Sequence, residues 1–328
     1  MIRVIGRFGG VSADLVLAQV GEVSPWRFQP HPEVWALIAF LAVSYWYAVT
    51  RIGPRVARPG EVVASRRQIT WFAGGLLTLW VASDWPVHDI AEQYLYSVHM
   101  SQHLLLSFAA PPMFLLATPT WLARLVLGTG RGYRLVKRLA RPIPATVAFN
   151  AVVVFSHWPA VVNVSVSNPV LHYLVHVAVV LTALLMWLPI AGPIPELRFS
   201  LPVQMIYLFL QSIIPTVPAG WLTFADSAVY KSYDIPTRVF GLSVTYDQQI
   251  AGMQMKVLAG IFLWTVIAIK FIRFATKSGE DDRARGKALD RRAPVGVGPD
   301  GETLTWEQVE RALAEAGPAP AEGQRPRS

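Results

Sequence analysis

Long apolar runs separated by short polar loops dominate the chain. Most of these runs approach the ~20 residues that a helix needs to cross a bilayer. We identify seven, at roughly 33–50, 69–84, 95–117, 145–162, 170–192, 201–224 and 248–274. The pattern predicts an all-α, polytopic membrane protein built as a seven-helix transmembrane bundle.

Two more polar stretches flank the predicted bundle. We interpret residues 1–32 as an extracytoplasmic N-terminal extension, because their apolar stretch is too short for a signal peptide. Residues 275–328 are rich in Pro, Gly, Arg and Asp, so we expect a largely disordered cytoplasmic tail. Within the tail, residues 304–316 favour one short helix that Thr305 would cap.

Composition agrees with a membrane protein and narrows its chemistry. Apolar residues make up 53% of the chain and charged residues only 15%, against about 25% charged in soluble domains. The net charge of +8 lies in the loops between apolar runs, which indicates membrane topology and argues against nucleic-acid binding. The chain has no cysteine, so disulfides and thiolate metal sites are excluded.

Basic residues alternate between successive loops and predict the orientation. The loops after the first and third spans are rich in arginine, whereas the loop after the second carries only the acids Asp84, Asp89 and Glu92. Because Lys and Arg accumulate in cytoplasmic loops, we expect the N-terminus outside and the C-terminus in the cytoplasm.

All seven histidines fall in segments that this topology places near the outer face of the membrane. Four of them form two His-x3-His pairs, His99 with His103 and His172 with His176. Residues four apart in a helix lie on one face, so each pair can point both imidazoles into the bundle. Ionisable side chains inside a membrane protein usually mark a functional site.

Several polar residues near the same face are weaker candidates. His88, in the outer loop, and His157, near the outer end of the fourth span, either complete a site or lie at the interface. Gln102 and Gln248 can orient imidazoles from a second layer. Asp247 can do the same, or it can cap the seventh helix.

The start of the seventh span adds sulfur and a charge. Met253 and Met255 point to different faces of that helix, so at most one of them joins the cluster. Lys256 is the basic residue deepest inside a predicted span, so it should face a polar interior or pair with an acid.

Paired imidazoles on two helices can perform three kinds of chemistry. They can bind copper, ligate haem from both sides, or relay protons. The alternative is that each imidazole only hydrogen-bonds a neighbouring helix. The common signatures of soluble enzymes are missing, since the chain has no phosphate-binding glycine loop, nucleophile elbow or HExxH motif. We do not expect an enzyme, because holding and passing on an ion makes or breaks no substrate bond.

Several motifs in this chain resemble those of one family. They are the run His99-Met100-Ser101-Gln102-His103, then Ala110-Pro111-Pro112 and Thr118-Pro119, then His172 with His176 and Met186-Trp187, and finally Asp247-Gln248-Gln249 with Gly252 and Met255. Together these motifs resemble the CtaG-type cytochrome c oxidase assembly factors across residues 33–274.

The resemblance implies a membrane protein of the bacterial plasma membrane that assists maturation of a haem-copper oxidase by delivering copper. It implies metal binding at His99, His103, His172 and His176, with Met255 as a soft ligand. The expected cofactor is copper as Cu(I), with haem as the alternative. The expected partners are the oxidase catalytic subunit and an extracytoplasmic copper chaperone. The rival functions are a b-type haem protein, a copper or proton transporter, and an assembly scaffold without metal.

Overall fold

A computed structural model describes residues 24–58, 60–235, 239–292, 294–297, 301 and 303–316. The described chain is almost entirely helical, which confirms the predicted all-α class. It forms two compact units, and the division between them falls between Ile267 and Ala268. Most of the predicted N-terminal extension, residues 1–23, lies outside the described residues.

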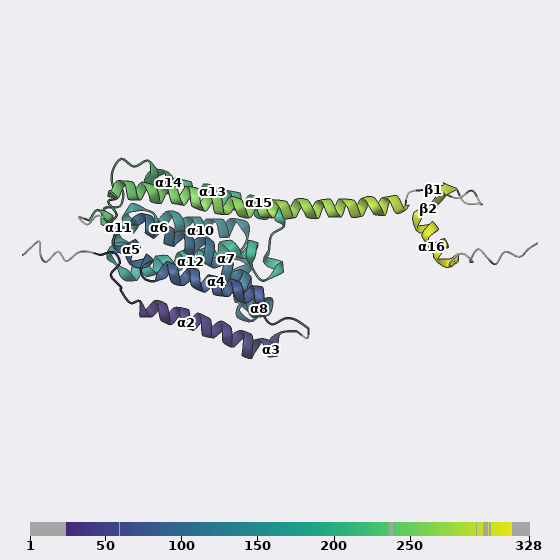
Figure 1. Ribbon diagram of the computed structural model, residues 1–328, viewed down its shortest axis with the longest axis horizontal. Coiled ribbons are helices and arrows are strands. Elements are labelled where there is room, and N and C mark those ends of the chain that lie inside the picture. The colour runs from purple at the N-terminus through teal and green to yellow at the C-terminus, as the bar shows by residue number, and fades with distance from the viewer. Residues whose placement is uncertain are drawn as a thin grey trace, which may run out of the picture. The chain divides into compact units, whose positions relative to one another are not determined.

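The first unit is a bundle of helices with short connections (Figure 1). Its first half contains α2 (Pro32–Tyr47), η1 (Ala48–Ile52), α3 (Gly53–Val56), α4 (Arg66–Ser83), α5 (Val87–Gln93), α6 (Tyr96–Leu104), η2 (Leu105–Ala109), α7 (Ala110–Ala117), α8 (Thr120–Leu127) and α9 (Arg131–Leu139). Its second half contains α10 (Pro142–Ser156), α11 (Pro159–Ser167), α12 (Pro169–Ala191), η3 (Pro195–Leu197), α13 (Leu201–Ile213), α14 (Thr216–Thr223), η4 (Lys231–Tyr233) and the first part of α15 (Val244–Arg292).

Packing within this unit follows a simple order. Helix α2 lies at one edge of the bundle and packs on α4, which packs on α7 (Figure 1). Helix α7 packs on α12, α12 on α10, and α10 on α13. Helix α12 is therefore central, and it carries one of the two histidine pairs.

Among the described residues, five helices are long and apolar enough to cross a membrane. The pair α9 and α10, bent by 77° at a short break, makes six at most. The predicted span 69–84 corresponds to α4, whose apolar content is lowered by Arg66, Arg67 and Gln68 at its start. The chain is thus a multi-pass membrane protein, and the count of seven stays a prediction.

The outer surface of the bundle is apolar, as a lipid-facing surface requires. None of the side chains of α2 is buried, although most of them are apolar; Phe40 is 66% exposed and Trp46 is 57% exposed. Soluble proteins rarely expose apolar faces of this extent. In a bilayer the same face is stable because lipid replaces water around it.

Prolines break one of the predicted spans and leave a carbonyl without its helical partner in another, which remains continuous from Tyr96 to Ala117. The fourth span ends at Ser156 rather than at residue 162, because Pro159 cannot continue the helix and begins α11 instead. In the third span, Pro111 has no N–H to donate to the carbonyl of Ser107, four residues earlier. The indole Nε1 of Trp187 donates to that carbonyl at 3.0 Å, which ties α12 to η2.

The main core adjoins the histidine pairs at His103 and is rich in aromatic residues. Phe108, Phe149, Trp187, Tyr207 and Leu263 belong to one buried cluster contributed by η2, α10, α12, α13 and α15. The cluster joins helices that are distant in sequence, so it holds the histidine-bearing helices in register.

Helix α15 approaches α14 closely at Gly252. A Cβ atom at this position would lie 2.7 Å from the carbonyl oxygen of Ala219 and 2.8 Å from the backbone nitrogen of Thr223. Both contacts are with backbone, which cannot rotate away. Only glycine therefore allows the two helices to pack at this distance.

We expect Gly252→Ala to destabilise the bundle by about 1–3 kcal/mol, because α15 must shift away from α14. Gly260→Ala is the matched control on the same helix, since its Cβ would meet nothing within 4 Å. That variant should be neutral or slightly stabilising, because alanine favours helix more than glycine does. Thermal unfolding in detergent compares the two, and equal melting temperatures would contradict the close approach.

The second unit contains the end of α15, β1 (Pro294–Val297), β2 (Thr303–Thr305) and α16 (Trp306–Ala316). The two short strands pair antiparallel. The predicted helix at 304–316 appears as α16, and Gln308 Oε1 accepts a hydrogen bond from Thr305 N at 2.7 Å. The expectation of a largely disordered tail differs from the structure at 275–292, where α15 continues because the segment is rich in helix-forming Lys, Glu, Arg and Ala.

Candidate metal centre

The two predicted histidine pairs face each other across the interface between α6 and α12. The ring centres of His99 and His172 are 5.5 Å apart, and those of His103 and His176 are 4.8 Å apart. Within each helix the paired rings stack one turn apart, at 4.6 Å in α6 and 4.4 Å in α12. The structure therefore brings all four imidazoles into one cluster.

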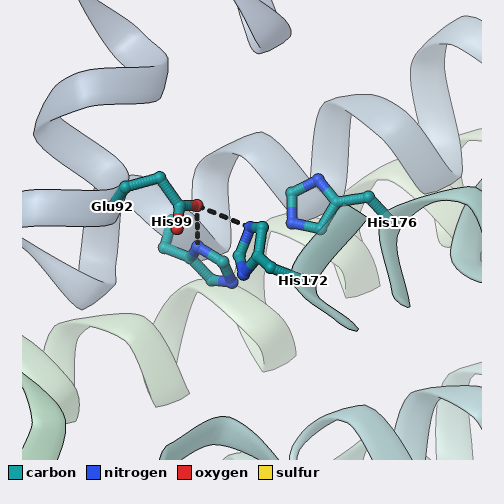
Figure 2. A group of neighbouring side chains, drawn as sticks. All are labelled: Glu92, His99, His172 and His176. Atoms are coloured by element: carbon teal, nitrogen blue, oxygen red, sulfur yellow. Dashed lines mark hydrogen bonds and ion pairs between the residues drawn. The ribbon is translucent and has the colours of Figure 1, made fainter. Parts of the chain in front are cut away.

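A carboxylate completes this cluster. Glu92 of α5 points toward the imidazoles, with Oε1 2.8 Å from His172 Nε2 and 3.2 Å from His99 Nδ1 (Figure 2). One ligand atom from each of Glu92, His99, His172 and His176 lies within 4.8 Å of the others. We call these four residues the outer site, because the topology predicted from the sequence places them near the outer face.

Electrostatics make the outer site attractive to a cation. Burial by itself would raise the pKa of the Glu92 carboxyl, but hydrogen bonds from His172 and His99 hold that pKa well below its usual range. The carboxylate is therefore ionised at neutral pH. It can orient two imidazoles and also supply negative charge beside them.

Several buried imidazole nitrogens have no hydrogen-bond partner. They are Nε2 of His103, Nε2 of His157, Nδ1 of His172 and Nε2 of His176. Leaving a buried polar atom unsatisfied costs about 1–3 kcal/mol, so four in one place need an explanation. A metal ion would accept these lone pairs, and the nitrogen-rich donor set suits copper or zinc. The residues present therefore fit a metal ion.

His88 and His157 lie on two sides of the cluster. The Nδ1 atom of His88 accepts a hydrogen bond from Gln102 Nε2 at 3.2 Å, so Gln102 contacts an imidazole outside the two pairs. Burial lowers the pKa of His88, so this ring is neutral at pH 7.

The ring of His157 lies 5.7 Å from that of His103. His31 packs edge-on against His88, so a further imidazole extends the group beyond the two pairs.

Asp247 has a role that the sequence did not suggest. It caps α6, not its own helix: its carboxylate accepts hydrogen bonds from Tyr96 N at 2.7 Å, from Ser97 N at 3.1 Å and from Ser97 Oγ. The first N–H groups of a helix have no partner inside it, and a carboxylate stabilises them well. The first turns of α6 carry His99, so Asp247 anchors the segment that positions it.

Gln248 does not touch an imidazole, so the predicted orienting role is wrong for this residue. Its Oε1 accepts from Val229 N at 2.8 Å and Tyr230 N at 3.1 Å, and its Nε2 donates to Tyr230 O at 3.0 Å. These three bonds fasten the loop before α15. Tyr230 in turn donates to the carbonyl of His157 at 2.8 Å, which links the loop to the site.

The two methionines of α15 separate as expected. Met255 is buried, and Met253 is 51% exposed and points away from the cluster. Lys256 is exposed, and its Nζ donates to Thr216 Oγ1 at 2.7 Å. The expectation that Lys256 faces a polar interior or pairs with an acid is wrong, because this hydroxyl satisfies one of its donors instead.

Sequence reasoning missed Glu92 as a site residue. It was recognised only as one of three acids in an outer loop, although it lies seven residues, about two helical turns, before His99. An acid this close to a histidine pair is a usable signal. The turn between α5 and α6 that brings it back over the imidazoles is a property of the fold.

Fold and site together define a multi-pass helical membrane protein with a buried cluster of imidazoles and one carboxylate. Residues 22–277 match the family described as cytochrome c oxidase caa3 assembly factor. The match covers well over half of the chain, so the chain belongs to this family of assembly factors, as its motifs predicted. Searches of curated proteins and of solved structures found no match.

Proposed function

We propose that this assembly factor holds a copper ion transiently and delivers it to the catalytic subunit of a haem-copper oxidase. The observation that carries the proposal is the outer site, in which three imidazoles and one carboxylate converge within 4.8 Å. No substrate bond is made or broken in such a role, so the protein acts as an accessory factor and not as an enzyme.

Copper suits the outer site for chemical reasons. Neutral imidazoles are good copper ligands, and the chain has no cysteine that would favour a closed thiolate site. The Glu92 side chain is 19% exposed, so the site is reachable from outside the bundle. A carrier needs such access, because the ion must enter and leave.

The proposed orientation places the outer site near the extracytoplasmic face of a bacterial plasma membrane. The acidic loop that carries Glu92 lies outside in this topology, the arginine-rich loops lie in the cytoplasm, and α4 provides the seventh span. An extracytoplasmic copper chaperone would then supply the ion, and the oxidase subunit would receive it within the membrane.

Haem is the alternative cofactor, and the close packing of the imidazoles argues against it. The cavity that adjoins the outer site at His103 has a volume of about 30 Å³, and no outer-site residue lines it. Pockets for cofactors and drug-sized ligands are usually about 300–1,000 Å³. The four imidazoles also contact one another closely, with no slot between α6 and α12 for a macrocycle.

Metal analysis tests the proposal. Protein purified without chelators and loaded with Cu(I) under reducing conditions should retain at least about one copper per chain and show no Soret band. A Soret band with stoichiometric haem would replace the proposal by the haem alternative. Protein that retains no metal would be a scaffold only. Copper or proton flux in reconstituted vesicles would instead identify a transporter.

A further inference from the structure

A small cavity next to the outer site has an unusual combination of side chains. It has a volume of about 30 Å³ and is lined mainly by apolar residues of η2, α10, α12 and α15. His103, His157, Met100 and Met255 also line it, and none of the four outer-site residues does. Two imidazoles and two thioethers therefore border one small cavity.

Hydrogen bonding fixes the tautomer of His157 and leaves one ring nitrogen with a free lone pair. Its Nδ1 lies 2.6 Å from the carbonyl oxygen of Val153, so Nδ1 carries the proton and donates it. Its Nε2 is then the unprotonated nitrogen, and it is buried without a partner. A ring held through one nitrogen by a backbone carbonyl, with the other nitrogen free, is the usual arrangement of a metal-binding histidine.

His103 supplies a second free nitrogen. Its Nε2 is also buried without a partner, and its ring lies 5.7 Å from that of His157. The two rings come from α6 and from the end of α10, so they approach the cavity from different helices. This convergence is independent of the pairing between α6 and α12 that forms the outer site.

The methionines make the cavity suitable for a soft ion. Met100 is 1% exposed and Met255 is 5% exposed, and both belong to the same buried cluster. Thioether sulfur favours Cu(I) over harder cations such as Mg²⁺ or Ca²⁺. Apolar surroundings also suit a monovalent ion that needs no water or carboxylate.

We propose that His103, His157, Met100 and Met255 form a second metal site, the inner site, which takes a soft monovalent cation such as Cu(I). The proposal rests on the proposed function and extends it, because it divides copper holding between two adjacent sites. The ring of His103 lies 4.6 Å from His99 and 4.8 Å from His176. An ion can therefore pass from the outer site to the inner site without returning to water.

Titration of the full-length protein with Ag(I), a soft monovalent probe that does not change oxidation state, tests the inner site. The native protein should bind about two ions per chain, and the double variant Met100→Leu/Met255→Leu about one. Leucine nearly conserves the volume of methionine, so the bundle should remain folded. Met186→Leu is the control, because Met186 is fully buried in a different cluster.

X-ray absorption of the Cu(I)-loaded protein gives a second readout. Sulfur should appear among the copper neighbours in the native protein and in Met186→Leu, and should disappear in the methionine double variant. Conversely, the double variant His172→Ala/His176→Ala should lose the ion at the outer site. It should keep the ion at the inner site, with sulfur among its neighbours.

The outcomes separate the two proposals. A native protein that binds one ion, with only nitrogen and oxygen neighbours, overturns the inner site and leaves the outer site intact. If two ions persist in the methionine double variant, and neither protein shows sulfur among the copper neighbours, the inner site is also overturned, because the second ion then binds somewhere else. Binding of no ion at all overturns the proposed function itself.

Discussion

Replacing both His99 and His172 by alanine is expected to abolish copper retention at the outer site. The two rings lie 5.5 Å apart on different helices, and both contact Glu92. Their removal takes away half of the four candidate ligands and leaves the carboxylate without its two imidazole partners. Removing a residue that only hydrogen-bonds a metal ligand lowers metal affinity about 10–100-fold. Because this variant removes two of the ligands themselves, we expect its copper affinity to fall by at least about 100-fold.

The measurement is copper content after equilibration with a competing Cu(I) chelator. The double variant should still insert and fold, because neither residue belongs to the main buried cluster that joins the helices. His31→Ala is the control, since His31 is an imidazole of the outer region that contacts His88 and Asp89 but not the outer site. Unchanged copper content in the double variant would show that the site is assigned to the wrong residues.

Asp247→Ala is expected to destabilise the protein and to weaken copper binding together. The carboxylate is 3% exposed and accepts three hydrogen bonds at the start of α6. Hydrogen bonds to a charged group contribute about 1.5–3 kcal/mol each, and the freed backbone groups stay buried. Because the bonds are coupled, we expect a loss of about 2–4 kcal/mol rather than their sum.

Copper retention should fall as well, because fraying of the first turn of α6 displaces His99. Asp247→Asn keeps an acceptor oxygen and should lie between the native protein and the alanine variant in both properties. Asp226→Ala is the control, since Asp226 is an exposed acid in the loop before α15. Melting temperature and copper content are measured side by side. An Asp247→Ala protein with native values of both would rule out the capping role.

Several details of the site followed from local pattern. The His-x3-His spacing required each pair to share one face of a helix, whatever the helix packed against. The opposite positions of Met253 and Met255 followed from the same helical period. The break before α11 also has a local cause, because Pro159 has no N–H to continue the helix, although the predicted span ran on to residue 162.

Other details required the chain to fold. Glu92 reaches the imidazoles because the helix is interrupted at Tyr94 and Leu95, which lets α5 pack against α6. Asp247 caps a helix that begins about 150 residues earlier in the sequence. Such contacts have no periodicity to reveal them, because they depend on which helices become neighbours.

The sequence by itself determined the helical class, the approximate spans, the family and the two histidine pairs, because apolar runs, helical spacing and motifs are local properties. Only the tertiary structure decided that α6 and α12 face each other, that a carboxylate joins three imidazoles, and that His103 and His157 border a separate cavity with two methionines. The physical reason is that close packing between helices distant in the chain sets these distances, and side-chain volumes and buried hydrogen bonds across the whole bundle determine that packing.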